Sequence, residues 1–228
     1  MYLKHPHIEE VENGNIDYII KTTPIVLNIN SEDVNKVGNY YLPYSTGFEI
    51  ECEQGSSFNV ENFLNIPYIL DVNIDKTEQR FRIPKGIKGI QCLYNISQEL
   101  IKNSLLNEGS GIHYHIDFTD CYDSLNKENI NLNSDWILKE LDTCEYKGNY
   151  NRRHCEFNTF HNWVRFQDCF KTMEIRIGEM TFDYPLLFKR ITHANQIARK
   201  LKNSIKKDLL SAYDSDIESI IKNRIQKI

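Results

Sequence analysis

Three separated segments of the chain alternate between apolar and polar residues, which is the pattern of a β-strand that buries one face. The segments span residues 47–53, 112–118 and 172–178. The apolar residues that share a face are Phe48, Ile50 and Cys52 in the first segment, Ile112, Tyr114, Ile116 and Phe118 in the second, and Met173, Ile175 and Ile177 in the third. Each segment therefore predicts a strand that packs one face against a hydrophobic core.

The opposite faces of these segments carry side chains suited to chemistry. They are Glu49, Glu51 and Glu53 in the first segment, His113, His115 and Asp117 in the second, and Glu174 and Arg176 in the third. If the strands are neighbours, the carboxylates repel one another and favour bound cations. Carboxylates with a few imidazoles suit Mg²⁺ or Mn²⁺, and such a face is suited to holding phosphates. The alternative is three amphipathic strands whose polar faces meet solvent.

The rest of the chain predicts short strands, an irregular stretch and helices. We expect short strands at residues 16–20, 25–29 and 39–42, and irregular structure at 61–90, where Pro67 and Pro84 are breakers and Gly86 and Gly89 suit turns. We expect helices at 90–106, from Asn133 or Ser134 after a polar loop, at about 187–201 with Pro185 in the first turn, and from Asp214 onwards. The helix after the loop should bury Trp136, Ile137 and Leu141, and the next helix Leu187, Ile191, Ala194, Ala198 and Leu201.

Composition narrows the class of protein. With 228 residues, 40% hydrophobic and 26% charged, the chain predicts one mixed domain over residues 1–228. Its core should span about 46–200 and a helical extension about 203–228. The net charge of −5 argues against a nucleic-acid partner. A mean hydropathy of −0.52 argues against a membrane partner.

The polar N-terminal residues have no secretory pattern, so we expect a cytoplasmic protein. The six cysteines show no CxxC spacing and are expected to be reduced.

The three strands also carry short motifs in a definite order. Glu-x-Glu stands at 49–51, Ser-Gly-x-His-x-His at 110–115 and Glu-x-Arg at 174–176, followed by Thr-x-Asp at 181–183. This order resembles the glutamine synthetase superfamily, and more closely its amidoligase branch of ATP-dependent carboxylate–amine ligases, which is common in phages and bacteria. The resemblance covers about residues 46–200.

The resemblance implies an α+β fold with a curved antiparallel sheet, a glutamine synthetase-like catalytic fold, helices on the convex side and a helical C-terminus. It implies an enzyme of the bacterial or phage-infected cytoplasm that forms an amide or peptide bond through an acyl phosphate, using ATP and Mg²⁺ or Mn²⁺. Its other partners would be a carboxylate-bearing substrate and an amine donor, for which peptide, protein and cell-wall sources are all compatible.

The resemblance also implies roles for metal ligands. Glu49, His113 and Glu174 resemble the ligands of a metal on the nucleotide side. Glu51 resembles a ligand of a second metal on the substrate side.

The remaining implied roles concern phosphate. His115 resembles the residue that contacts the nucleotide phosphates, and Arg176 resembles the arginine that stabilises the transferred phosphoryl group. Either Arg152 or Arg153 meets phosphate or the substrate carboxylate, since both fall where the superfamily has an arginine-bearing strand.

One departure from the superfamily pattern concerns the second metal site. An acidic residue is usual on a strand before the histidine strand, where this chain has Arg80 and Arg82. Either Glu78 or Glu53 takes the place of that acid, or the second metal is held weakly and one of the arginines binds an acidic substrate. The base that deprotonates the amine is also open, with Glu53 and Asp117 as candidates.

Two other functions compete with the ligase. His113 and His115 with a distant Glu174 would suit an iron enzyme on a cupin-like barrel, but that hypothesis gives Glu49, Glu51 and Arg176 no role. The other alternative is a catalytically inactive binding module on the same fold.

Overall fold

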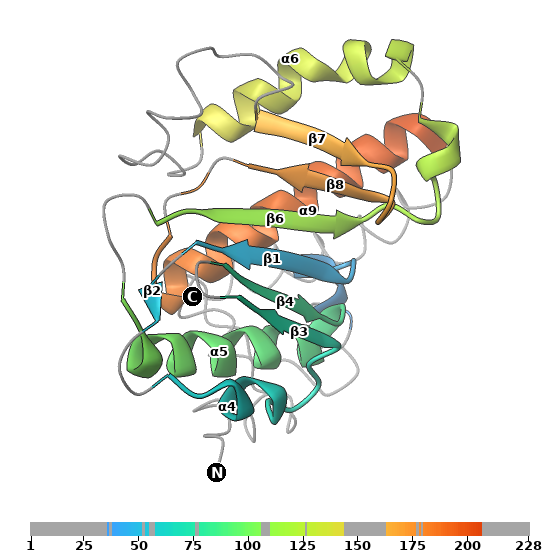
Figure 1. The fold of residues 1–228 in the computed structure, drawn as a ribbon. Coiled ribbons are helices and arrows are strands. Elements are labelled where there is room, and N and C mark those ends of the chain that lie inside the picture. The colour runs from blue at the N-terminus through green and yellow to red at the C-terminus, as the bar shows by residue number, and fades with distance from the viewer. Residues whose placement is uncertain are drawn as a thin grey trace, which may run out of the picture.

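The motif-bearing segments lie side by side in one sheet. In the computed structural model the order of the six strands is β3-β4-β1-β6-β8-β7, and every pair is antiparallel (Figure 1). The strands are β1 (Thr46–Ile50), β3 (Asp71–Ile74), β4 (Gln79–Ile83), β6 (Ile112–Asp117), β7 (Val164–Gln167) and β8 (Thr172–Ile175). The three strands that carry the charged and imidazole side chains are therefore neighbours, with β6 between β1 and β8.

The structure describes most of the chain. The described residues are 36, 38–51, 53–54, 58–75, 78–105, 110–125, 127–143, 163–176, 178 and 180–206. The strands predicted at 16–20 and 25–29 and the helix predicted from Asp214 lie outside them. The domain boundaries, including the extension at 203–228, stay a prediction.

One face of the sheet packs against helices and forms the core. Helix α9 (Tyr184–Lys206) packs against β6 and runs behind the sheet, and α5 (Gly86–Asn103) packs against β4 (Figure 1). Helix α6 (Lys127–Thr143) packs against α9. The predicted apolar stripe of α9, from Leu187 to Leu201, is fully buried. The α+β class is thus confirmed, with an antiparallel sheet and helices on one of its faces.

The sheet face toward the core is apolar because alternate residues point to it. Phe48, Tyr114 and Met173 are each 0–1% exposed. Among the described helices, none is both long and apolar enough to be a membrane span.

Several predicted elements are wrong in place or type. Residues 38–41 are helical instead of a strand. The stretch predicted as irregular contains α4 (Val60–Leu64), β3 and β4. Helix α6 begins at Lys127, within the predicted polar loop, because the sequence of its first turn, Lys-Glu-Asn, shows no apolar period.

Helix α5 also begins earlier than predicted, at Gly86, so that Gly89 lies in its first turn instead of in a loop. A Cβ at position 89 would stand 1.8 Å from the carbonyl oxygen of Pro84 and 2.5 Å from Leu42 Cδ2. Glycine is required there because the helix approaches the preceding chain this closely.

We expect Gly89→Ala to lower the free energy of unfolding by about 3 kcal/mol, since the added methyl group overlaps backbone that must move. Urea denaturation measures the change. Gln91→Ala, on the same helix, is the control and should stay within about 0.5 kcal/mol of the parent. A Gly89→Ala protein as stable as the parent would contradict this packing.

Candidate functional site

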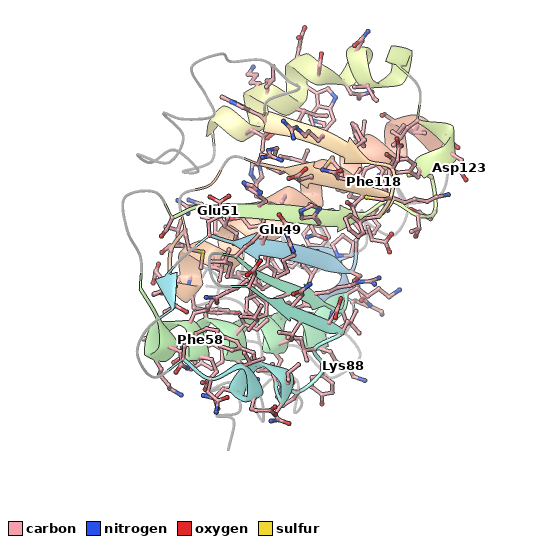
Figure 2. The ribbon with its side chains drawn as sticks, viewed as in Figure 1. Glu49, Glu51, Phe58, Lys88, Phe118 and Asp123 are labelled. Carbon is pink, nitrogen blue, oxygen red and sulfur yellow. The ribbon has the colours of Figure 1, made fainter. Side chains whose placement is uncertain are left out.

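The antiparallel register gathers the charged residues of three strands on the sheet face opposite the core. Glu49 on β1 is directly opposite His113 on β6 and Arg80 on β4. His115 on β6 is directly opposite Glu174 on β8. Figure 2 shows Glu49 over the middle of the sheet. Since opposed residues of paired strands point to the same face, these side chains converge.

Two imidazoles and two carboxylates surround a common centre. His113 Nδ1 lies 3.6 Å from Glu49 Oε2 and 3.6 Å from Glu174 Oε1. His115 Nε2 lies 3.5 Å from Glu49 Oε1 and 4.0 Å from Glu174 Oε1. These distances exceed those of good hydrogen bonds, so the four groups face one another without tight pairing. We call Glu49, His113, His115 and Glu174 the Glu/His cluster.

Part of this cluster has the spacing of a metal site. Glu49, His115 and Glu174 each offer a ligand atom, and these atoms lie within 4.8 Å of one another. His115 Nδ1 is 3.3 Å from Thr172 Oγ1, which leaves Nε2 toward the carboxylates. Metal-binding histidines are commonly oriented in this way through their second nitrogen. The donor set of oxygen and imidazole nitrogen fits a divalent cation.

Glu174 is the most buried acid of the cluster, at 2% exposure. It accepts hydrogen bonds from Arg176 Nη1 at 2.9 Å and from Gln167 Nε2 at 2.5 Å. A buried carboxylate needs such partners because it has left water. Arg176 is therefore held at the border of the cluster, with part of its guanidinium beside Glu174.

Glu49 is strongly stabilised as a carboxylate. The His113 side chain, followed by that of His115, holds the pKa of Glu49 far below its usual range, against the opposing effect of burial. Arg80 Nε donates to Glu49 Oε1 at 3.2 Å, and the other end of the Arg80 guanidinium contacts Glu78.

Glu78, just before β4, is brought next to Glu49. Burial raises the pKa of Glu78, and a hydrogen bond with Glu49 raises it further. Of the two acids proposed to complete a second metal site, Glu78 thus adjoins the cluster. Glu53 lies in β2 (Glu53–Gln54), which pairs with β5 (Ser104–Leu105) outside the six-stranded sheet.

Glu51 stands just beyond β1, since the predicted strand 47–53 ends at Ile50. Its N–H donates to the carbonyl of Gly111 at 2.9 Å, and Figure 2 shows it toward the end of the strand relative to Glu49. The negative charge of Glu51 contributes to the raised pKa of Glu78, so the two carboxylates repel each other.

The arginines predicted at 152 and 153 lie outside the described residues. Sequence reasoning missed Arg165 and Gln167 on β7, which share the polar face of the sheet. Arg165 is directly opposite Glu174 and is exposed. The alternation of Val164, Arg165, Phe166 and Gln167 is the signal that predicts this strand.

A pocket of about 320 Å³ opens beside the cluster. Glu49, His115 and Arg80 line the end that adjoins the cluster. Its remaining lining is Ser45, Gly47, Phe48, Asp71, Phe81, Arg82, Asp117, Thr119, Phe170 and Thr172. The cluster and an open binding space therefore lie together on the polar face of the sheet.

Comparisons with known proteins add little to this geometry. No protein-family model and no curated protein matches the chain. The chain is similar to the crystal structure of a bifunctional glutathione synthetase from Pasteurella multocida, at 12% identity and a TM-score of 0.27. That match covers 75% of this chain and 41% of the synthetase chain. A likeness this weak carries no argument about fold or activity, so function is argued from the site.

Proposed function

We propose that the protein is an ATP-dependent carboxylate–amine ligase of the amidoligase type, built on a glutamine synthetase-like sheet. The observation that carries this proposal is the convergence of the Glu/His cluster and Arg176 on one sheet face beside a pocket. The motifs that suggested the resemblance come from strands that are direct neighbours in the sheet.

The reaction needs activation because a carboxylate in water is a poor acceptor for an amine. In the proposed reaction a substrate carboxylate oxygen attacks the γ-phosphorus of ATP, the bond to the bridging oxygen breaks, and ADP leaves. The amine nitrogen then attacks the acyl carbon and gives up a proton, and inorganic phosphate leaves. Arg176 supplies positive charge where the phosphoryl group is transferred.

The Glu/His cluster would hold the metal. Glu49 and Glu174 with an imidazole provide the ligands, and a bound Mg²⁺ or Mn²⁺ would neutralise phosphate charge there. The assignment of His113 to the metal and of His115 to phosphate stays a prediction, because both imidazoles face both carboxylates.

The second metal is proposed to lie toward Glu51. The position of Glu78 supports this proposal, because its carboxyl group adjoins that of Glu49 and its pKa is raised by the charge of Glu51. It would supply the acid that the superfamily pattern otherwise lacks. In this arrangement the Arg80 guanidinium pairs with Glu49 and Glu78, and Arg82 is the arginine proposed to bind a substrate.

The described strands give the alternative iron enzyme no support. A cupin-like barrel needs two facing sheets. The described strands instead form one six-stranded sheet with β3 and β7 at its edges, and a separate two-stranded pair.

The experiment has a binding arm and a turnover arm. Mg-ATP should raise the melting temperature, because a ligand at 100 times its Kd adds about 2.7 kcal/mol to the free energy of unfolding. ADP should then be released when the protein is given a panel of carboxylates and amines. Absence of any stabilisation by Mg-ATP would contradict the proposal. Stabilisation without ADP release across the panel would favour the inactive binding module.

A further inference from the structure

The part of the pocket beyond the cluster is formed around the start of β1. Ser45 lies there between residues of the two strands that flank β1. Arg82 Nε on the β4 side donates to Ser45 Oγ at 3.3 Å. On the β6 side the N–H of Asp117 donates to the Ser45 carbonyl at 3.1 Å. The Arg82 side chain and the Asp117 backbone thus contact Ser45 from opposite sides, and both residues line the pocket.

These opposite charges do not neutralise each other. Within the described part of the chain, Arg82 makes no ion pair with Asp117 or with Asp71, its direct neighbour on β3. Arg82 is exposed, and Asp117 is half-buried. Among the described residues, the Asp117 carboxylate accepts hydrogen bonds at Oδ1 alone, from the N–H and hydroxyl of Thr119 at 2.9 and 2.7 Å. Among the charged residues that line the pocket, Arg82 and Asp117 therefore each have capacity for a ligand.

An aromatic ring forms another wall of this pocket. Phe170 is 68% exposed, more than any other large hydrophobic residue among those described. It lies in the turn between β7 and β8, which is tied to the chain after β6 by a backbone hydrogen bond from Phe118 N–H to the Lys171 carbonyl at 2.9 Å and by side-chain contacts. Tyr122 Oη donates to Asp168 at 2.8 Å, and Lys171 Nζ donates to Asp123 at 3.0 Å. The ring is thus held at the pocket, where a ligand with an apolar group would cover it.

We propose that this pocket binds a zwitterionic α-amino acid with an apolar side chain, and that this amino acid is the amine substrate. Its carboxylate would pair with Arg82, its ammonium with Asp117, and its side chain would pack on Phe170. The role of the amino acid as amine substrate rests on the proposed function. The prediction that the pocket binds it rests on the residues that line the pocket.

The test uses calorimetry on the full chain without ATP or metal. L-phenylalanine is the probe, and three analogues each lack one recognised group. They are 3-phenylpropanoate without the ammonium, phenethylamine without the carboxylate, and glycine without the apolar side chain. We expect L-phenylalanine to bind and each analogue to bind at least about tenfold more weakly, since a charge-assisted contact, or the burial of an apolar side chain, contributes roughly that factor.

Single substitutions locate the binding. Arg82→Gln, Asp117→Asn and Phe170→Ala should each weaken L-phenylalanine binding by about tenfold or more. Lys85→Gln, an exposed charge change outside the pocket lining, is the matched control and should bind as the parent does. Absence of binding by L-phenylalanine overturns the proposal, and so does binding that the three substitutions leave unchanged.

The outcomes separate this inference from the proposed function. Stabilisation by Mg-ATP and ADP release with some other amine, without amino-acid binding, would overturn the inference and leave the ligase standing. Amino-acid binding that depends on Arg82 and Asp117, in a protein that Mg-ATP does not stabilise, would support the pocket and count against the ligase.

Discussion

Arg176→Lys is expected to fold normally and to bind Mg-ATP, yet to form ADP about a hundredfold more slowly or worse, which is the usual scale for losing one transition-state donor. Lysine keeps the positive charge but not the planar fork that holds a phosphoryl group through two donors. One donor of Arg176 is engaged by Glu174, at 2.9 Å, so the guanidinium is already oriented.

The competing explanation is that Arg176 serves only as the partner of Glu174. In that case lysine would preserve the ion pair and turnover would stay near that of the parent. The measurement is the rate of ADP release at saturating Mg-ATP, with thermal stabilisation by Mg-ATP recorded on the same samples. Near-parent turnover would make the arginine structural and would count against phosphoryl transfer at this site.

Glu49→Gln is expected to abolish stabilisation by Mg²⁺ or Mn²⁺ with ATP. The amide has the shape of the carboxylate but lacks the charge that a hard cation needs. Without metal the protein should still fold, with a lower free energy of unfolding, because the amide no longer presents a negative charge to His113, His115 and Arg80.

The control for Glu49→Gln is Asp123→Asn. Asp123 is 84% exposed, and Figure 2 shows it beyond the end of β6, away from Glu49. Melting curves with and without metal and ATP compare the two proteins. The Asp123→Asn protein should respond to metal and ATP as the parent does. An equal response from Glu49→Gln would show that the cluster is not the metal site.

The local sequence pattern predicted strands β1, β6 and β8 well, because the alternation of apolar and polar residues follows directly from the burial of one strand face. The apolar faces of β1, β6 and β8 are buried as expected. The stripe on α9 was predicted for the same reason, since one face of that helix meets the core.

The pairing of distant strands could not be predicted from a single sequence, because no local pattern specifies which strands are neighbours. The approach of Glu78 to Glu49 depends on the register of β4 against β1, and the place of Arg165 depends on the pairing of β7 with β8. The early start of α6 was missed because its first turns lack apolar periodicity. For Gly89, the sequence alone did not distinguish a turn from a close helix contact.

The interleaved strand order has a consequence for how the chain folds. β1 pairs with β6, and β6 pairs with β8, although these strands lie far apart in sequence. Topologies dominated by such distant pairings fold slowly, in roughly milliseconds to seconds, because long loops must close first. Glu49, His115 and Glu174 meet only when all three strands have reached their final register. Metal binding at this cluster would therefore be possible only after the last stage of folding. In a chain with one strand in the wrong register, the three ligands would not come together.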